Sequence, residues 1–156
     1  DGEVWTASPI LGGNVNYAFQ LTNQANNKTI FVKQAPEFVA VFGPDGFPLT
    51  SARMQQEIDV YNRWNEILGE KDALTFLPKI HYFDKVNMVI VMEFLEGYDL
   101  LEHMIVSSGQ VTEFTASHLG EFMGRVHVAT HASKLPAEEV ATLTSCFENR
   151  AMRDVQ

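Results

Sequence analysis

The chain has 156 residues, of which 46% are apolar, enough for a domain with a hydrophobic core and too many for a disordered polypeptide. Its 11 basic and 20 acidic residues give a formal charge of −9, which disfavours nucleic acid and anionic membrane surfaces as partners. The longest apolar run, residues 88–92, is too short to span a membrane. The single cysteine, Cys146, excludes an internal disulfide and suits a reducing compartment, so we expect a cytoplasmic protein.

The first part of the chain alternates apolar and polar residues at the period of a β-strand. Five strands are expected, over residues 4–11, 17–22, 29–34, 79–83 and 88–94. Turn-forming residues at 23–27 separate the second strand from the third, and the polar link 84–87 predicts a hairpin between the last two. Five short strands with one inserted helix predict an α+β fold, in which an antiparallel sheet is covered on one face.

The inserted helix is expected over residues 51–68, with Thr50 as its N-cap and Gly69 as its C-terminal stop. Glu57 lies on or beside its apolar stripe, and a carboxylate in that position needs a cation, for which Arg53 and Lys33 are the candidates. The stripe recurs at helical spacing and is expected to face the sheet; it comprises Met54, Ile58, Tyr61, Trp64, Ile67 and Leu68.

The pattern becomes helical after residue 94. Asp99 with Glu102 resembles a capping box at the start of a short helix, and Pro136 is expected in the first turn of another. A longer helix is expected over 112–131, with a core stripe of Leu119, Phe122, Met123 and Val126. We therefore expect three parts, which are a sheet unit over 1–94, a linker over 95–98 and an incomplete helical unit over 99–156. Because no Met begins the chain and its last residues continue a helical pattern, we expect a fragment of a longer protein.

A glycine turn, a strand lysine and a helix glutamate follow one another along the chain. Gly12-Gly13-Asn14 can be an ordinary hairpin turn, and Lys33 can be an ordinary solvent-facing lysine. In this order, however, the turn, Lys33 and Glu57 are typical of the phosphate-binding half of a kinase-type nucleotide site. Glycine lets the backbone approach a polyphosphate, and Asn16 adds an amide at the edge of the turn.

The end of the last strand has two interpretations. It can be a plain strand end, or a hinge in which the Glu93 carbonyl and the Leu95 amide pair with an adenine edge. The sequence contains no His-x-Asp catalytic loop and no Asp-Phe-Gly or Asp-Pro metal motif, so no catalytic residue is expected within this chain. His127 and His131 are one helical turn apart, but no glutamate completes a metal motif, and we expect no metal site.

Five segments resemble methylthioribose kinases, which belong to the protein-kinase-like superfamily together with aminoglycoside and choline kinases. The segments are 31–36, 47–50, Arg53 with Glu57, 88–93 and 118–124. The resemblance implies a kinase-like N-lobe, a hinge and the first helices of a C-lobe. It also implies that the full-length protein uses ATP and Mg²⁺ to phosphorylate the anomeric hydroxyl of S-methyl-5-thioribose, a step of methionine salvage, and it is compatible with a homodimer.

The resemblance also assigns roles to individual residues. It places Asn16, within a glycine loop that includes Gly13 and Asn14, and Lys33 on the ATP phosphates. It makes Glu57 the partner of Lys33, and it makes the backbone of Glu93, Phe94 and Leu95 the adenine hinge. The family's Gly-Asp-Gly-Asn-Leu-Asn loop reads Leu-Gly-Gly-Asn-Val-Asn here, so its aspartate is lost, and Phe47 replaces a typical Trp.

The acceptor base and the Mg²⁺ ligands are expected beyond Gln156, so we expect this chain alone to be inactive. Two alternatives stay open. One is a kinase for an aminoglycoside, choline or homoserine, and the other is a non-catalytic nucleotide-binding or scaffold domain.

Overall fold

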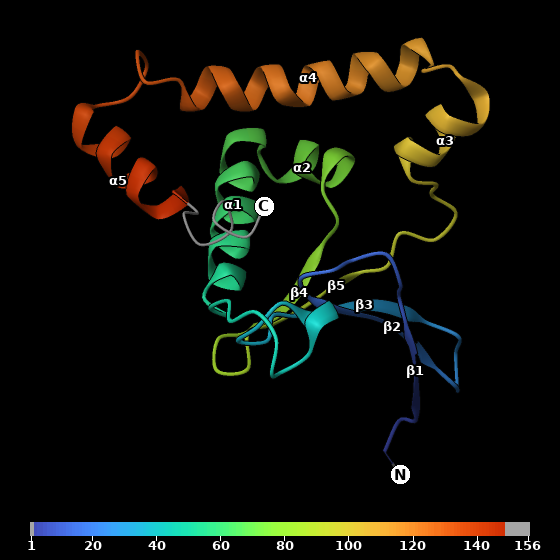
Figure 1. Cartoon of the computed structure of the whole chain (residues 1–156). Helices are drawn as coiled ribbons and strands as arrows, with labels where there is room; N and C mark the ends of the chain where they lie inside the picture. Colours follow the sequence, from blue (N-terminus) through green and yellow to red (C-terminus); the bar gives the residue numbers. More distant parts are fainter. Residues whose placement is uncertain (1, 149–156) are drawn as a thin grey trace.

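The computed structural model describes residues 2–148 of the chain. A five-stranded antiparallel sheet lies below a group of helices (Figure 1), with the strand order β1-β2-β3-β5-β4. The strands are β1 (Trp5–Pro9), β2 (Tyr17–Asn23), β3 (Thr29–Gln34), β4 (Ile80–Asp84) and β5 (Val89–Glu93). The predicted α+β fold with five antiparallel strands is confirmed.

The strand boundaries agree with the prediction for β3 and differ by one or two residues elsewhere. Met88 was expected to begin the last strand, but its φ of 51° places it in the left-handed region, so it completes the turn before β5. The turn is stabilised by Asp84, whose carboxylate accepts hydrogen bonds from the backbone of Val86 and Asn87. The predicted hairpin of β4 and β5 is confirmed.

The helices are η1 (Ala40–Phe42, a 3₁₀ turn), α1 (Arg53–Leu68), α2 (Glu70–Phe76), α3 (Leu101–Ser108), α4 (Glu113–Thr130) and α5 (Ala137–Phe147). Gly69 ends α1 with a φ of 78°, as predicted. Helix α2 was not predicted, because the chain re-enters a helix immediately after this glycine, with acidic residues in the new first turn. None of the described helices is long and apolar enough to cross a bilayer.

Three predicted helix starts are wrong. Thr50 is not the N-cap of α1, because the helix begins at Arg53. Asp99 does not cap α3, which starts after Leu100 with no side-chain cap. Pro136 precedes the first helical residue of α5 instead of lying in its first turn. Each error is a shift of one or two residues, the usual uncertainty of helix ends. The helical pattern expected at 153–156 lies outside the described residues.

Two apolar clusters form the core. The first joins α1 to the sheet and comprises Ala35, Met54, Ile58, Ile90 and Met92, with Phe31 and Tyr61 against it. The second joins the end of α1 to α2 and α4 and comprises Leu68, Ala73 and Leu77, with Trp64 and Phe122 against it.

The two predicted apolar stripes are therefore only partly correct. On α1, the first half of the stripe faces the sheet as expected, but the second half packs against other helices. On α4, Val126 is buried, whereas Leu119 is 47% exposed and Met123 is 44% exposed. Helical spacing shows that a helix has an apolar face, but it does not show what that face packs against.

Candidate functional site

Lys33 and Glu57 form an ion pair between β3 and α1. The Lys33 Nζ atom lies 2.8 Å from both Oε1 and Oε2 of Glu57. The side chains are 25% and 29% exposed, so the pair lies at the edge of the core and stays open to solvent. Of the two cations that the sequence offered to Glu57, the structure selects Lys33 and places Arg53 elsewhere.

The alternation of β3 explains the position of Lys33. Phe31, two residues earlier on the same face, packs against the cluster that joins α1 to the sheet. Lys33 lies opposite the fully buried Ile90 on β5, so its ammonium emerges where that core ends. A lysine ammonium carries three N–H donors, and Glu57 accepts two of them. The third donor is available to an oxygen of an anionic ligand.

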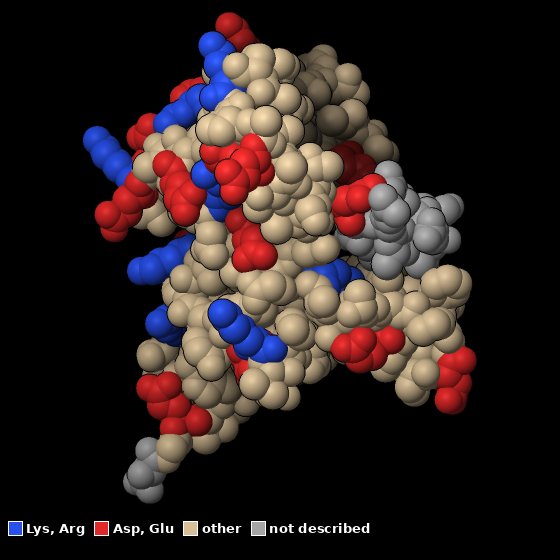
Figure 2. Space-filling view, turned by 90° about the vertical axis from the view of Figure 1, so that its left-hand side faces the viewer, with Lys and Arg blue, Asp and Glu red and all other residues tan. Residues whose placement is uncertain are grey.

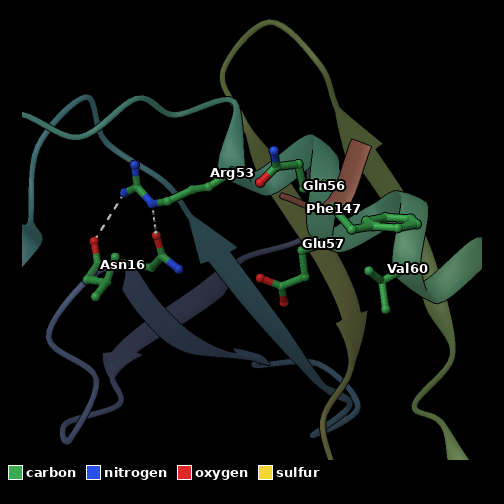
Figure 3. Close-up of a pocket in the computed structure, with 7 residues that line it drawn as sticks. Asn16, Arg53, Gln56, Glu57, Val60 and Phe147 are labelled. Carbon is green, nitrogen blue, oxygen red and sulfur yellow. Dashed lines mark hydrogen bonds between the residues drawn. The ribbon is translucent and has the colours of Figure 1, made fainter. Parts of the chain in front are cut away.

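A pocket of about 310 Å³ opens beside this pair (Figure 3). It brings together Asn16, Arg53 and Glu57, which lie on the glycine turn and on α1. The residues that line it are Val15, Asn16, Arg53, Gln56, Glu57, Val60 and Phe147. Burial, and secondly the charge of Glu57, raise the pKa of Tyr61 on the same helix, so its phenol stays neutral.

The glycine turn is held from the loop that follows β3. Gly12 has a φ of 107°, a conformation that other residues rarely adopt. The carbonyls of Asn14 and Val15 accept hydrogen bonds from the amides of Val41 and Ala40, at 2.9 and 3.3 Å. The altered sequence of this turn therefore forms a defined structure that is fixed to η1.

Asn16 lies in the pocket, but half of its carboxamide is engaged. Its Oδ1 accepts a hydrogen bond of 2.9 Å from Nε of Arg53, which leaves the amide hydrogens as the donors that can reach a ligand. Arg53 was expected only as a candidate partner for Glu57, and its contact with Asn16 was not predicted. The signal was present, since Arg53 directly precedes the stripe residue Met54.

The predicted hinge residues lie at the other end of β3 from Lys33. Glu93 pairs with Ile30, and Lys33 pairs with Ile90, so three residues of strand, about 10 Å, separate the two positions. The Glu93 amide donates to the Lys79 carbonyl, and the Phe94 carbonyl accepts from the Glu96 amide. Glu93 and Phe94 border a different cavity, of about 560 Å³. The structure thus joins Asn16, Lys33 and Glu57 and leaves the hinge segment separate from them.

Eight curated proteins with similar sequences are named methylthioribose kinase. The chain is 26% identical over 149 residues to a methylthioribose kinase of Geobacillus sp. (strain WCH70). The matched residues make up 96% of this chain and 36% of that protein. The chain is 28% identical over 144 residues to the methylthioribose kinase of Bacillus velezensis, covering 92% and 35%. For the protein of that name from Klebsiella pneumoniae (strain 342) the identity is 25% over 153 residues, covering 98% and 37%.

The resemblance to methylthioribose kinases is confirmed. It extends over nearly the whole chain, whereas the chain spans little more than a third of the length of these relatives. No protein-family model matches the chain. The five-stranded sheet with α1 is consistent with a kinase-like N-lobe.

Charged groups on the surface are mixed in sign. On the face shown in Figure 2, Asp and Glu side chains lie among Lys and Arg side chains, and no continuous basic area is visible there. Within residues 2–148, no group of three or more His, Cys, Asp or Glu side chains could hold a metal ion.

Proposed function

We propose that this chain is the ATP-binding part of a small-molecule kinase, and that the acceptor of the full-length protein is S-methyl-5-thioribose. The observation that carries the proposal is the Lys33–Glu57 pair, in which both carboxylate oxygens hold one strand ammonium beside the glycine turn. The names of the relatives support the kinase activity and the choice of acceptor.

Each residue has a defined task in this proposal. Glu57 orients the Lys33 ammonium, whose remaining N–H donor binds a phosphate oxygen of the nucleotide. Asn16 and the backbone of Gly13 and Asn14 lie along the polyphosphate. The backbone from Glu93 to Leu95 pairs with the adenine. This segment lies three residues of β3 away from Lys33, a separation that the length of one nucleotide can span.

The chemistry of transfer depends on groups that we assign to the remainder of a longer protein. When bound, Mg²⁺ would neutralise charge on the phosphates, and an acidic residue outside this chain would accept the proton of the acceptor hydroxyl. In this arrangement residues 1–94 form the nucleotide-binding lobe, 95–98 the hinge and 99–156 the beginning of the helical lobe. Holding a phosphate without an acceptor base or Mg²⁺ ligands gives binding without turnover.

The test is an ATP titration of the wild-type chain against Lys33→Ala, with Lys134→Ala as the matched control, because Lys134 is an exposed lysine in the turn between α4 and α5. We expect Lys33→Ala to weaken ATP binding by about tenfold or more, as loss of a charge-assisted hydrogen bond predicts, and Lys134→Ala to leave it unchanged. Equal and negligible binding by all three proteins would favour a scaffold domain and defeat the proposal.

An ADP-release assay separates binding from catalysis. With ATP, Mg²⁺ and methylthioribose, the 156-residue chain is expected to release no ADP above the background without protein. The alternative acceptors are tested on a protein that contains this sequence and has the length of the relatives. Choline, homoserine and an aminoglycoside are each compared with methylthioribose as the acceptor. Turnover by the 156-residue chain would contradict the assignment of the acceptor base to another part of the protein.

A further inference from the structure

Arg53 is a buried cation that forms no ion pair with a carboxylate of residues 2–148. The residue is 7% exposed. Among residues 2–148, Asn23 is the only other buried residue with a polar or charged side chain. None of the ion pairs within that range includes Arg53. Burial lowers the pKa of its guanidinium, and the charge of Glu37 offsets this only in part. A charge in such a place requires many hydrogen bonds.

All five N–H donors of the guanidinium are used. Nε donates to Oδ1 of Asn16 at 2.9 Å. Nη1 donates to the carbonyls of Leu49 and Thr50, at 3.0 and 2.6 Å. Nη2 donates to the carbonyls of Val15 and Phe38, at 3.1 and 3.4 Å. Since no donor is left, Arg53 cannot also bind a phosphate, although it lines the pocket.

The five acceptors belong to two segments, the end of the glycine turn and the loop between β3 and α1. Val15 and Asn16 end the glycine turn, as Figure 3 shows for the two contacts to Arg53. The other three acceptors lie at the two ends of the loop between β3 and α1. Arg53 itself lies one helical turn before Glu57 on α1. One side chain therefore ties the glycine turn to the helix that orients Lys33.

We propose that Arg53 is a positioning residue, which fixes the glycine turn to α1 so that the turn and the Lys33–Glu57 pair keep one geometry. That this geometry serves the phosphates of ATP rests on the proposed function. The fixing of the turn does not, since it follows from the hydrogen bonds alone.

The first experiment measures amide hydrogen exchange in the 156-residue chain. The amides of Ala40 and Val41 are the reporters, because their acceptors are the carbonyls of the glycine turn. The variant is Arg53→Lys, which keeps the charge but places three donors on one atom and cannot reach acceptors on both sides. The matched control is Arg63→Lys on the same helix, whose partners are Glu66 and Glu139.

In Arg53→Lys we expect the two reporter amides to exchange about tenfold faster than in the wild type, because the turn opens locally. The Asn23 amide, which donates to Lys28 at the far end of β2, is expected to keep its rate. Arg63→Lys should change neither rate. Unchanged exchange at Ala40 and Val41 in Arg53→Lys overturns the proposal, and so does an equal increase at Asn23, which would show general destabilisation.

A second measurement compares ATP with AMP. A displaced turn affects the outer phosphates, which AMP lacks. Arg53→Lys is therefore expected to weaken the binding of ATP by about tenfold and the binding of AMP by less than about twofold. Equal weakening of both nucleotides would overturn the positioning role at the phosphates. Failure of the wild type to bind ATP would overturn the proposed function, while the exchange rates still decide whether Arg53 fixes the turn.

If Arg53→Lys does not fold, Asn16→Ala takes its place in the exchange experiment. It removes a single acceptor and leaves the four carbonyls bonded. We expect the reporter amides to exchange about threefold faster, and an unchanged rate would again overturn the proposal.

Discussion

The sheet with α1 and the helices α3 to α5 differ in how much they bury. The largest fully buried side chains of the described residues are Met54, Ile90 and Asn23, which all lie in the sheet or on α1. Among the buried apolar residues of the core, α3 to α5 contribute only Val126. The helices instead expose large apolar side chains, which are Met104, Ile105, Val106, Phe114, Leu119, Met123 and Val128. The sheet unit therefore carries most of the stability of this chain.

Helix α4 contacts α1 and α2, and helix α5 is joined to α1 by the Arg63–Glu139 ion pair. Trp64 of α1 meets Phe122 of α4 edge to face, with ring centroids 5.2 Å apart. Arg125 of α4 donates to the carboxylate of Asp72 and to the carbonyl of Leu68, at 2.9 and 3.0 Å. Helix α4 is thus fixed to α1 and α2 along one face. Substitutions on either side of this contact measure how far the two regions depend on each other for stability.

The largest effect is expected from truncation of Met54, which is 0% exposed. Met54→Ala leaves a cavity between α1 and the sheet and should lower the free energy of unfolding by about 2–5 kcal/mol. The matched substitution Met123→Ala, at a side chain that is 44% exposed, should cost less than about 0.5 kcal/mol. Urea unfolding followed by circular dichroism measures both. Equal costs would show that the two regions share one core.

The next effect concerns the contact itself. Phe122→Ala removes a partly buried ring and is expected to cost about 2 kcal/mol, less than truncation of a fully buried Phe. The control is Phe114→Ala on the same helix, whose ring is 70% exposed. A double-mutant cycle with Trp64→Ala should give a coupling of about 0.5–1.5 kcal/mol for the edge-to-face pair. A coupling near zero would mean that the two rings fill volume in the core without a specific interaction energy between them.

The sheet with α1 was easier to predict from the sequence than the packing of helices α3 to α5. Strand β3 and the positions of Lys33 and Glu57 were predictable from period-2 alternation and one helical stripe. The residues alone left Lys33 and Arg53 as two candidate partners of Glu57, and only the family resemblance chose Lys33. The outward orientation of Met123 was not predictable, because α4 has an apolar face that the described part of the chain leaves largely uncovered. The five bonds of Arg53 were not predictable either, since they join segments up to 38 residues apart in sequence.

The ion pair at the candidate site is expected to contribute moderately to stability. A double-mutant cycle of Lys33→Ala and Glu57→Ala should give a coupling of about 1 kcal/mol, because the pair is partly shielded and both oxygens are bonded. The Arg125–Asp72 pair, with an aspartate that is 51% exposed, should give less than about 0.5 kcal/mol. Salt should reduce the second coupling more than the first. The reverse order would contradict the view that Lys33 and Glu57 form a preorganised pair.

The smallest effect concerns how the two regions begin their helices. Ahead of α1, the Glu37 carboxylate accepts hydrogen bonds from the hydroxyl and the backbone amide of Ser51, whereas α3 starts without a side-chain cap. The hydroxyl bond, then the amide bond, lower the pKa of Glu37 below its ordinary value of 4.5, with a lesser contribution from the charge of Arg53. A lowered pKa in the folded state means that the ionised form stabilises the fold. That contribution is complete above the unfolded pKa and is lost as the pH falls through the folded pKa.

Glu37→Gln should therefore reduce the free energy of unfolding slightly at pH 7. The difference from the wild type should stay constant down to about pH 5 and vanish below the folded pKa of Glu37, where both proteins carry a neutral side chain. Urea unfolding of the two proteins between pH 7 and pH 3 measures this difference. A difference that is the same at every pH would show that Glu37 holds Ser51 through the shape of its side chain, and that its charge adds nothing to the start of α1.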